Sequence, residues 1–411
     1  MKKEIECQKS FVQEISTLQL LQSFFKYCPV FCTLFSVILL HFFPSNVESA
    51  ELLVPDDYFT IMEAIEEAYE GDTVLVYPGT YYERIVLKDG VDLVSYDGDD
   101  GNELVDGPGL RKVLRRTVRT IVDGSDLEEP GYLIQFPTEA KNPGRVDGFT
   151  FQNMPKYVSG IMLYLMEIRG CSPLVVNNIF TGNKTWGAIL NTGLGVGMGP
   201  ALDAVARPTI RNNVIYNNYS LGIGNGPNSE AHIIDNEIFG NEYREGWEID
   251  RVAPGIGVRE VSRPIIENNV IYENGVGVGA VNFSPFGKPL IIRGNTLFNN
   301  RRAGIGMMGI GSLETGVEVV VENNTIYGNM TAAILCKRVD RVTIRYNNMF
   351  DNRKSGISLW SVDHIVIEDN DIHGNLTAGI RITDVKTAVI QRNTIYQNAT
   401  AGIDFTSWEN D

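Results

Sequence analysis

A short stretch in the middle of the chain gathers residues that could do chemistry. It contains Trp247, Glu248 and Asp250, and Arg259 and Glu260 follow closely. A tryptophan can stack on a sugar ring, carboxylates can bind Ca²⁺ or transfer a proton, and an arginine can neutralise a uronate. A solvated loop of charged residues with one aromatic is the alternative. The candidate catalytic residues are therefore Glu248, Asp250, Arg259 and Glu260, and Trp247 and Arg259 are candidates for substrate binding.

A row of glycines offers a place where a sugar could lie. Each glycine follows an inward-facing aliphatic residue of the repeat described below, at an outward position: Gly224, Gly257, Gly279 and Gly306. Positions without side chains leave a trough of bare backbone that a ligand can approach closely. We take these four as further substrate-binding candidates. The alternative is that glycine only eases tight turns.

Insertions enlarge the same middle part of the chain. They fall at residues 191–206, 242–254, 281–288 and 309–316. Loops on a rigid scaffold are where binding and catalytic residues are usually found, so the insertions favour a functional reading of the glycine row.

The chain repeats itself with a period of 23 residues in its C-terminal part, where the motif Asn-x-Ile-Tyr-x-Asn or a close variant starts at Asn324, Asn347, Asn370 and Asn393. Earlier copies start at Asn213, Asn236, Asn269 and Asn295, with a looser copy at Asn177. A Gly-Ile pair follows most of these asparagines nine residues later. A fixed short period is the signature of a solenoid in which each repeat forms one coil.

Within each coil, apolar residues alternate with period two over a few residues, which indicates short strands and not helices. Aliphatic residues stand three positions before and two positions after the anchor, as Ile344 and Met349 do around Asn347. Stacked coils, about 4.8 Å apart, would bury these side chains and align the asparagines in ladders. The predicted fold class is all-β: a single-stranded parallel β-helix, with at least nine coils from about residue 140.

A second outward row carries charge. Two positions before the anchors the sequence has Arg211, Ile234, Glu267, Arg293, Glu322, Arg345, Glu368 and Gln391. From Glu267 to Glu368 the sign alternates coil by coil, so neighbours should pair, each pair contributing about 0–1 kcal/mol. A face whose charges satisfy one another is a poor site for a polyanion, which favours the glycine row as the binding face.

The front of the chain is predicted to close the solenoid. Residues 51–135 would form the N-terminal cap and first coils, and residues 136–411 the repeats. Thr60-Ile-Met-Glu63 is a capping box that opens an amphipathic helix ending at Gly71, and such a helix can cover the open end of the core. Gly79 to Glu83 reads as a strand and turn with a structural role.

These repeats, together with Gly79-Thr-Tyr-Tyr-Glu83, resemble the pectin-lyase-like superfamily of right-handed parallel β-helices. The pattern is similar to that of its short-repeat members, among them periplasmic copper-site accessory proteins and mannuronan epimerase-like proteins. The resemblance spans roughly residues 51–408 and implies the fold, whereas one such scaffold hosts many chemistries. The catalytic motifs of the superfamily's methylesterases, polygalacturonases and alginate epimerases are absent from the sequence, so no catalytic residue is carried over.

Metals and thiols are few. Copper is disfavoured because only three histidines follow the first fifty residues and no Met/Cys set is clustered. Ca²⁺ bound by carboxylates remains open. Cys171 and Cys336 show no metal or redox spacing. Five coils would separate them by about 24 Å, whereas a disulfide needs Cα atoms within about 7 Å, so we predict free thiols.

The first fifty residues read as an export signal. Four lysines precede an apolar run, Pro29 to Phe43, and small residues before Ala50 offer a cleavage site. The run is short for a membrane span, although an uncleaved anchor is the alternative. We expect a secreted, periplasmic or cell-surface protein, off the membrane once the signal is cleaved.

The formal net charge is −16. An acidic surface repels phosphate backbones, so nucleic acid is not an expected partner. An acidic glycan would need local Arg or Lys, or a bound cation. The predicted function is binding of an acidic polysaccharide, with lyase or epimerase chemistry as its extension; the alternative is a non-catalytic scaffold or accessory protein of the cell envelope. The sequence leaves substrate, catalysis and oligomeric state open.

Overall fold

The computed structural model describes residues 49–129, 131–155, 163–194, 205–242, 253–283, 288–310 and 318–405. The leader predicted in residues 1–50 therefore lies almost wholly outside the described residues. So does most of the insertion with Trp247, Glu248 and Asp250. Among the described residues, none of the helices has the length and apolar character needed to cross a membrane.

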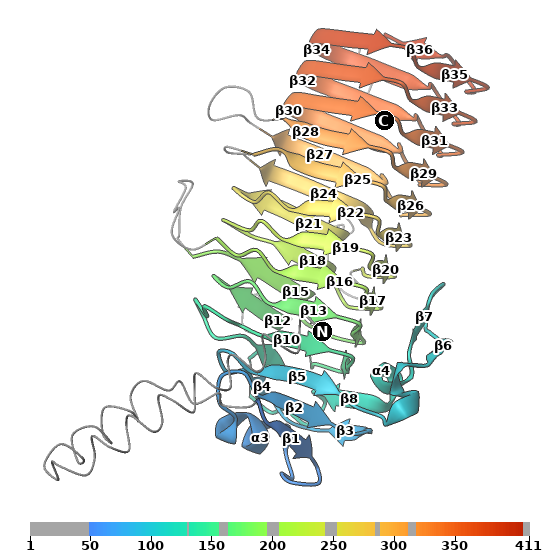
Figure 1. Ribbon diagram of the computed structural model, residues 1–411. Coiled ribbons are helices and arrows are strands. Elements are labelled where there is room, and N and C mark those ends of the chain that lie inside the picture. Colours follow the sequence, from blue (N-terminus) through green and yellow to red (C-terminus); the bar gives the residue numbers. More distant parts are fainter. Residues whose placement is uncertain are drawn as a thin grey trace, which may run out of the picture. The chain divides into compact units, whose positions relative to one another are not determined.

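Apart from the antiparallel pair β6 (Leu104–Asp106) and β7 (Lys112–Leu114), the described strands from residue 50 onward stack in parallel as a β-helix (Figure 1), which confirms the predicted fold class. One strand per coil joins a 12-stranded sheet, called the short sheet below: β3 (Gly79–Tyr81), β8 (Thr120–Asp123), β11 (Thr150–Gln152), β14 (Ile179–Thr181), β17 (Val214–Tyr216), β20 (Glu237–Phe239), β23 (Val270–Tyr272), β26 (Thr296–Phe298), β29 (Thr325–Tyr327), β31 (Asn348–Phe350), β33 (Asp371–His373) and β35 (Thr394–Tyr396). The strands from β11 onward give ten coils, in agreement with the prediction of at least nine.

The rest of each coil joins a 22-stranded sheet, called the long sheet below. Its strands are β1 (Glu51–Val54), β2 (Thr73–Val76), β4 (Ile85–Val86), β5 (Asp92–Ser95), β9 (Ile134–Gln135), β10 (Arg145–Asp147), β12 (Tyr164–Arg169), β13 (Leu174–Val176), β15 (Gly187–Thr192), β16 (Thr209–Arg211), β18 (Leu221–Asn225), β19 (His232–Ile234), β21 (Pro254–Glu260), β22 (Ile265–Glu267), β24 (Val276–Phe283), β25 (Leu290–Arg293), β27 (Ile305–Ile310), β28 (Val319–Glu322), β30 (Ile334–Arg345), β32 (Ile357–Glu368), β34 (Ile380–Gln391) and β36 (Ile403–Asp404). In β30, β32 and β34 the two halves of a coil run on as one bent strand.

The predicted asparagine ladder is present at the turn into the short sheet. The backbone N–H and side-chain amide of Asn324 both donate to Oδ1 of Asn347 at 2.9 Å, and the amide of Asn347 donates to Asn370 at 3.0 Å. The last asparagine of each motif builds a second ladder, as in the 2.9 Å bond from Asn329 to Asn352. Buried polar groups are thus satisfied from coil to coil.

One anchor differs from the prediction. In the coil before Asn213, the ladder residue is Asn178, whose backbone N–H lies 2.9 Å from Oδ1 of Asn213. Asn177 instead takes a left-handed backbone conformation, with φ of 58°, and lies outside the ladder. The neighbouring asparagines share one residue type, so spacing alone did not distinguish them.

The N-terminal end is covered as predicted by a helix, α3 (Ile61–Glu67), with a capping box between Thr60 and Glu63. The helix ends earlier than predicted, at Ala68 and not at Gly71. Both carboxylate oxygens of Glu83 accept backbone N–H bonds from Ile61 and Met62, each at 2.9 Å. A carboxylate at a helix N-terminus is favourable, so Glu83 has a structural part in the cap.

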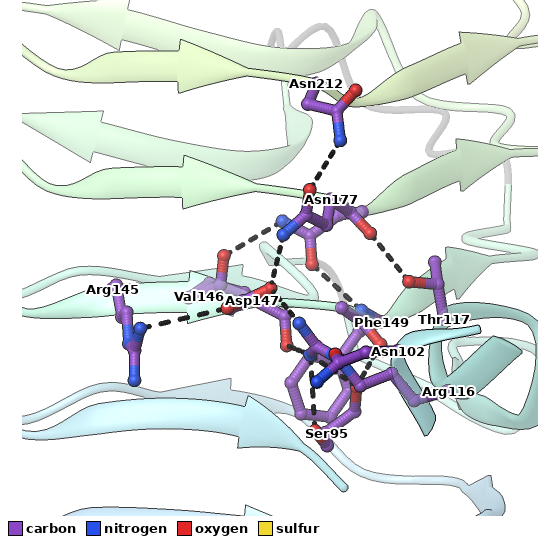
Figure 2. Close-up of polar contacts among 12 residues, drawn as sticks. Ser95, Asn102, Arg116, Thr117, Arg145, Val146, Asp147, Phe149, Asn177 and Asn212 are labelled. Atoms are coloured by element: carbon purple, nitrogen blue, oxygen red, sulfur yellow. Dashed lines mark hydrogen bonds and ion pairs between the residues drawn. The ribbon is translucent and has the colours of Figure 1, made fainter. Parts of the chain in front are cut away.

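A segment that the repeat pattern did not predict lies beside the short sheet (Figure 1). This segment, the strap, covers residues 97–119 and contains η1 (Asp99–Asn102), the antiparallel pair β6 (Leu104–Asp106) and β7 (Lys112–Leu114), and α4 (Arg115–Arg119). Arg116 ties its base to the coils: Nη2 lies 2.7 Å from Oδ1 of Asp147 and Nη1 donates to Ser95 (Figure 2). Arg116 is 7% exposed, so this ion pair is buried.

The outside of the short sheet carries a continuous stack of rings, the aromatic row: Tyr216, Phe239, Tyr272, Phe298, Tyr327, Phe350, His373 and Tyr396. Neighbouring ring centroids lie 4.8–5.3 Å apart. Each ring covers the face of the next, which stabilises the coil spacing and leaves mainly ring edges to solvent. The row therefore has a structural explanation that includes His373.

Candidate functional site

The four candidate glycines stack on one another as predicted. Gly224 pairs with Gly257, Gly257 with Gly279, and Gly279 with Gly306, in successive strands of the long sheet. They therefore form one row parallel to the solenoid axis.

The glycine row is nevertheless not the bare trough that the sequence predicted. Gly224, Gly257 and Gly279 are buried, and only Gly306 is partly exposed. A β-carbon at Gly257 would lie 3.0 Å from Cδ2 of Leu221, and one at Gly279 would lie 3.1 Å from Pro254. Large side chains from the start of each strand fold over the row, so glycine here makes room for them.

Arg259 remains on the surface beside this row. It lies two residues after Gly257 in β21 and is exposed, as is Glu260. A register shift follows Arg259, and Glu260 has a φ of 54°, so Glu260 turns away from the strand geometry. Of the candidate set, the structure brings Arg259 and Glu260 together with the glycine row; Trp247, Glu248 and Asp250 are outside the described residues.

The position of Arg259 continues along the long sheet as a second row. Its pairing partners in successive coils are Val281, Met308, Lys337 and Trp360, and we call these five residues the outer row. Val281 and Met308 are 36% and 38% exposed. Nζ of Lys337 lies 3.7 Å from the centroid of the Trp360 ring, within cation–π range. The row offers a cation at one end, apolar surface in the middle and a cation with an aromatic at the other.

Lys337 and Trp360 were not predicted as site residues, although the register that predicts the glycine row also predicts their positions. Both stand two positions after the outward residue of their coil, as Arg259 does after Gly257. The two-residue offset from the outward position of each coil was therefore the signal in the sequence that indicates both residues.

A buried carboxylate lies at the N-terminal end of the glycine row. Glu167 is 5% exposed; Oε1 accepts the Tyr132 hydroxyl at 2.9 Å and Oε2 accepts the Gln135 amide at 2.7 Å. Burial and the adjacent Glu167 raise the pKa of Tyr132. The tyrosine therefore keeps its proton, which makes it a poor base and gives the trio a structural part.

The charged row pairs as predicted. The guanidinium of Arg293 lies 3.1 Å from Glu267, and that of Arg345 lies 2.8 Å from Glu322. The strands carrying them are in register from Arg211 to Gln391. This face is satisfied internally, and the outer row on the other half of each coil is the better candidate for a ligand.

Within the described part of the chain, no group of three or more His, Cys, Asp or Glu side chains could hold a metal ion. The outer row itself contains no carboxylate. Ca²⁺ binding through Glu248 or Asp250 involves residues outside that part.

Comparisons with known proteins bear on the fold. The family described as "Right handed beta helix region" matches residues 141–318 and 309–410. A comparison with curated protein sequences finds no match.

Several solved structures are similar. PfbA, a surface adhesin of Streptococcus pneumoniae, is 16% identical with a TM-score of 0.52, over 87% of this chain and 94% of that one. The catalytic unit of a thermostable GH87 α-1,3-glucanase from Streptomyces thermodiastaticus is 13% identical with a TM-score of 0.51, over 88% and 70%. The Dettilon tailspike protein gp208 is 15% identical with a TM-score of 0.50, over 86% and 68%. At these identities the likeness shows the fold alone.

Proposed function

The chain belongs to the family of right-handed β-helix regions, and from that premise we propose that it binds an acidic polysaccharide along the outer row. The observation that carries the proposal is the alignment of Arg259, which is exposed, with the partly exposed Lys337–Trp360 pair on one line of the long sheet. A cation can neutralise a uronate, and apolar and aromatic surface can contact the sugar ring between charged groups.

Local charge supports an acidic ligand even though the chain carries a net charge of −16. Arg338 and Arg341 are exposed on the same strand as Lys337, with Asp340 between them. From Lys337 to Arg341 this coil therefore carries three basic side chains and one carboxylate. Local potential, and not net charge, governs where a polyanion is attracted.

The similar solved structures include a surface adhesin and an α-1,3-glucanase. The first is described as a surface protein, and the second as an enzyme named for a glucan. They support a glycan as the ligand class and an extracytoplasmic location for this chain. Processing of the glycan by a lyase or epimerase reaction is the extension of the proposal, with the insertion around Glu248 and Asp250 as its source of acid–base groups.

A binding experiment tests the proposal. The protein is titrated with polygalacturonate, alginate and a neutral glucan, with and without Ca²⁺, and Trp360→Ala and Arg259→Ala are compared with Arg345→Ala on the charged row. We expect the first two variants to weaken binding of the acidic polymers about three- to tenfold, since one exposed charged contact (Arg259) or one aromatic contact (Trp360) contributes about 1 kcal/mol. Equal weakening by Arg345→Ala would contradict the assignment of the face.

Catalysis has its own readout. A lyase product carries a conjugated double bond that absorbs in the ultraviolet, and an epimerase changes the uronate composition seen by NMR. Binding without either change would leave a binding protein and remove the enzymatic extension.

A further inference from the structure

Three basic side chains meet on one carboxylate at the bend between the two halves of the long sheet. Oε1 of Glu230 lies 2.6 Å from Nη2 of Arg263. Oε2 lies 2.9 Å from Nε of Arg207 and 3.0 Å from Nζ of Lys288. The side chains of Glu230 and Arg263 are 9% exposed, whereas those of Arg207 and Lys288 are 56% and 63% exposed. We call these four residues the Glu230 cluster.

The cluster is assembled across stacked coils. The backbone N–H of Glu230 donates to Ala206, and that of Arg263 donates to Ser229, so three successive coils supply the first three charges. Lys288 reaches in from the next coil, past Arg263, to an oxygen that is already paired. Two arginines repel this lysine, and its 3.0 Å contact with the carboxylate of Glu230 offsets that repulsion.

The carboxylate of Glu230 is ionised and holds the three basic side chains of the cluster in place. Burial by itself would raise the pKa of Glu230, but hydrogen bonds from Lys288 and Arg207 and the charge of Arg263 outweigh it and lower the pKa. The carboxylate therefore stays ionised at neutral pH. The exposed pair, Arg207 and Lys288, is oriented by its contacts with this carboxylate.

We propose that the Glu230 cluster is an anion-binding site, in which Arg207 and Lys288 hold a sulfate ester or carboxylate group of a polysaccharide. Arg207 uses only Nε toward Glu230, so both Nη groups of its guanidinium remain for a second oxyanion, which the planar fork binds bidentately. Cations that a buried partner has already fixed lose little entropy on binding. Nucleic acid is disfavoured because the acidic remainder of the surface repels a long phosphate backbone.

The identity of the polymer rests on the proposed function, whereas binding of an anionic group by Arg207 and Lys288 does not. Arg259 of the outer row and Arg263 of the cluster lie in one turn, where the hydroxyl of Ser262 donates to the carbonyl oxygen of Arg259 at 2.7 Å. The outer row and the cluster thus share the coil that carries Arg259 and Arg263.

The test uses the Arg207→Gln/Lys288→Gln double variant and a matched control, Lys386→Gln. Lys386 is 69% exposed and pairs with a single carboxylate, Asp363, at 2.7 Å, so its loss removes a similar exposed lysine without touching the cluster. The first readout is the melting temperature in sodium sulfate against sodium chloride at equal ionic strength. The second is the affinity for dextran sulfate, polygalacturonate and unmodified dextran.

We expect sulfate to stabilise the parent protein and the control more than the double variant, because only the general stabilising effect of sulfate remains once Arg207 and Lys288 are replaced. We also expect the double variant to bind the charged polymers about tenfold more weakly, from two exposed charged contacts, with unmodified dextran unaffected. A double variant that sulfate stabilises as much as the control overturns the anion site.

The two proposals fail separately. If Arg259→Ala and Trp360→Ala weaken polymer binding and the double variant behaves like the control in both readouts, the outer row stands and the anion site falls. If no polymer binds but the sulfate response depends on Arg207 and Lys288, the anion site stands and the proposed function falls.

Discussion

The hydroxyl of Tyr272 donates a 2.8 Å hydrogen bond to Oε1 of Glu237, a carboxylate with no exposed surface. The backbone N–H groups of Leu110 and Arg111 donate to the same carboxylate at 2.6 and 3.1 Å. Glu237 thereby joins the turn between β6 and β7, which is the tip of the strap, to the aromatic row. Burial, together with the bond to Glu237, raises the pKa of Tyr272, so the hydroxyl remains a donor across the physiological range.

Glu237→Gln should release the tip of the strap. The amide offers one acceptor oxygen in place of two and adds donors that face the N–H groups of Leu110 and Arg111, so we expect a loss of about 1–3 kcal/mol in the free energy of unfolding. Hydrogen exchange of residues 104–114 should rise, while the coils after residue 290 stay protected. Glu273→Gln is the matched control, because Glu273 is exposed in the next coil. Unchanged exchange in the strap would show that Glu237 does not hold it.

Part of the loss of folding stability at low pH should come from the charged row. A hydrogen bond from Arg293 and a second one from His232 lower the pKa of Glu267. A carboxyl group with a lower pKa in the folded state stabilises that state above its ordinary pKa, near 4.5, and loses this contribution as the pH falls below it.

Glu267→Gln should therefore cost about 1 kcal/mol at pH 7 and progressively less as the pH falls through the lowered pKa of the parent carboxyl, which then takes up a proton. Melting curves of the two proteins from pH 7 to pH 3 measure this difference. Parallel curves over the whole range would contradict an ionised Glu267–Arg293 pair.

Cys171 and Cys336 are both buried and free in the structure, as the coil register predicted. Burial raises the pKa of Cys171 to about 11 and that of Cys336 to about 12. The reactive form of a cysteine is the thiolate, so neither thiol should react with iodoacetamide at pH 8 in the folded protein. Both should react in strong denaturant without a reductant. A mass two hydrogens lower, with no reaction on unfolding, would reveal a disulfide and refute the register.

The features predicted from the sequence are those that recur once per coil. The anchors at Asn324 and Asn347 and the pairing of Glu322 with Arg345 followed from spacing, because parallel strands in register place equivalent residues one above another. The strap escaped prediction because its docking residue, Glu237, occupies an ordinary repeat position, and nothing local indicates that it receives a segment over 120 residues earlier in the chain.

The strand register of the candidate site was predicted correctly from the sequence, but the exposure of its glycines to solvent was not. The stacking of Gly257 on Gly279 followed from the repeat, whereas their burial depends on Leu221 and Pro254, which lie at the start of strands and fold over the next coil. Side-chain direction at a strand's first residue depends on the turn before it, and the turns here vary in length. The outer row could have been predicted from the same register, because its residues occupy the next outward position along each strand.

The glycine row yields a last prediction, because its members differ in how closely they are covered. A β-carbon at Gly306 would have its nearest neighbour, Cγ1 of Val276, at 3.4 Å, which is ordinary contact. Gly306→Ala should therefore stabilise the protein by about 0.4–1 kcal/mol, through the lower conformational entropy of the unfolded chain.

At Gly257 the balance reverses, since a β-carbon would lie 3.0 Å from Leu221. The branched side chain of Gly257→Val must displace Leu221 from a buried position, so we expect a loss of about 1–3 kcal/mol from overpacking. Urea unfolding of both variants measures the two effects. If Gly257→Val folds with parent stability and Gly306→Ala does not gain, the glycine row is open to solvent, and the trough that the sequence predicted would return as a binding surface.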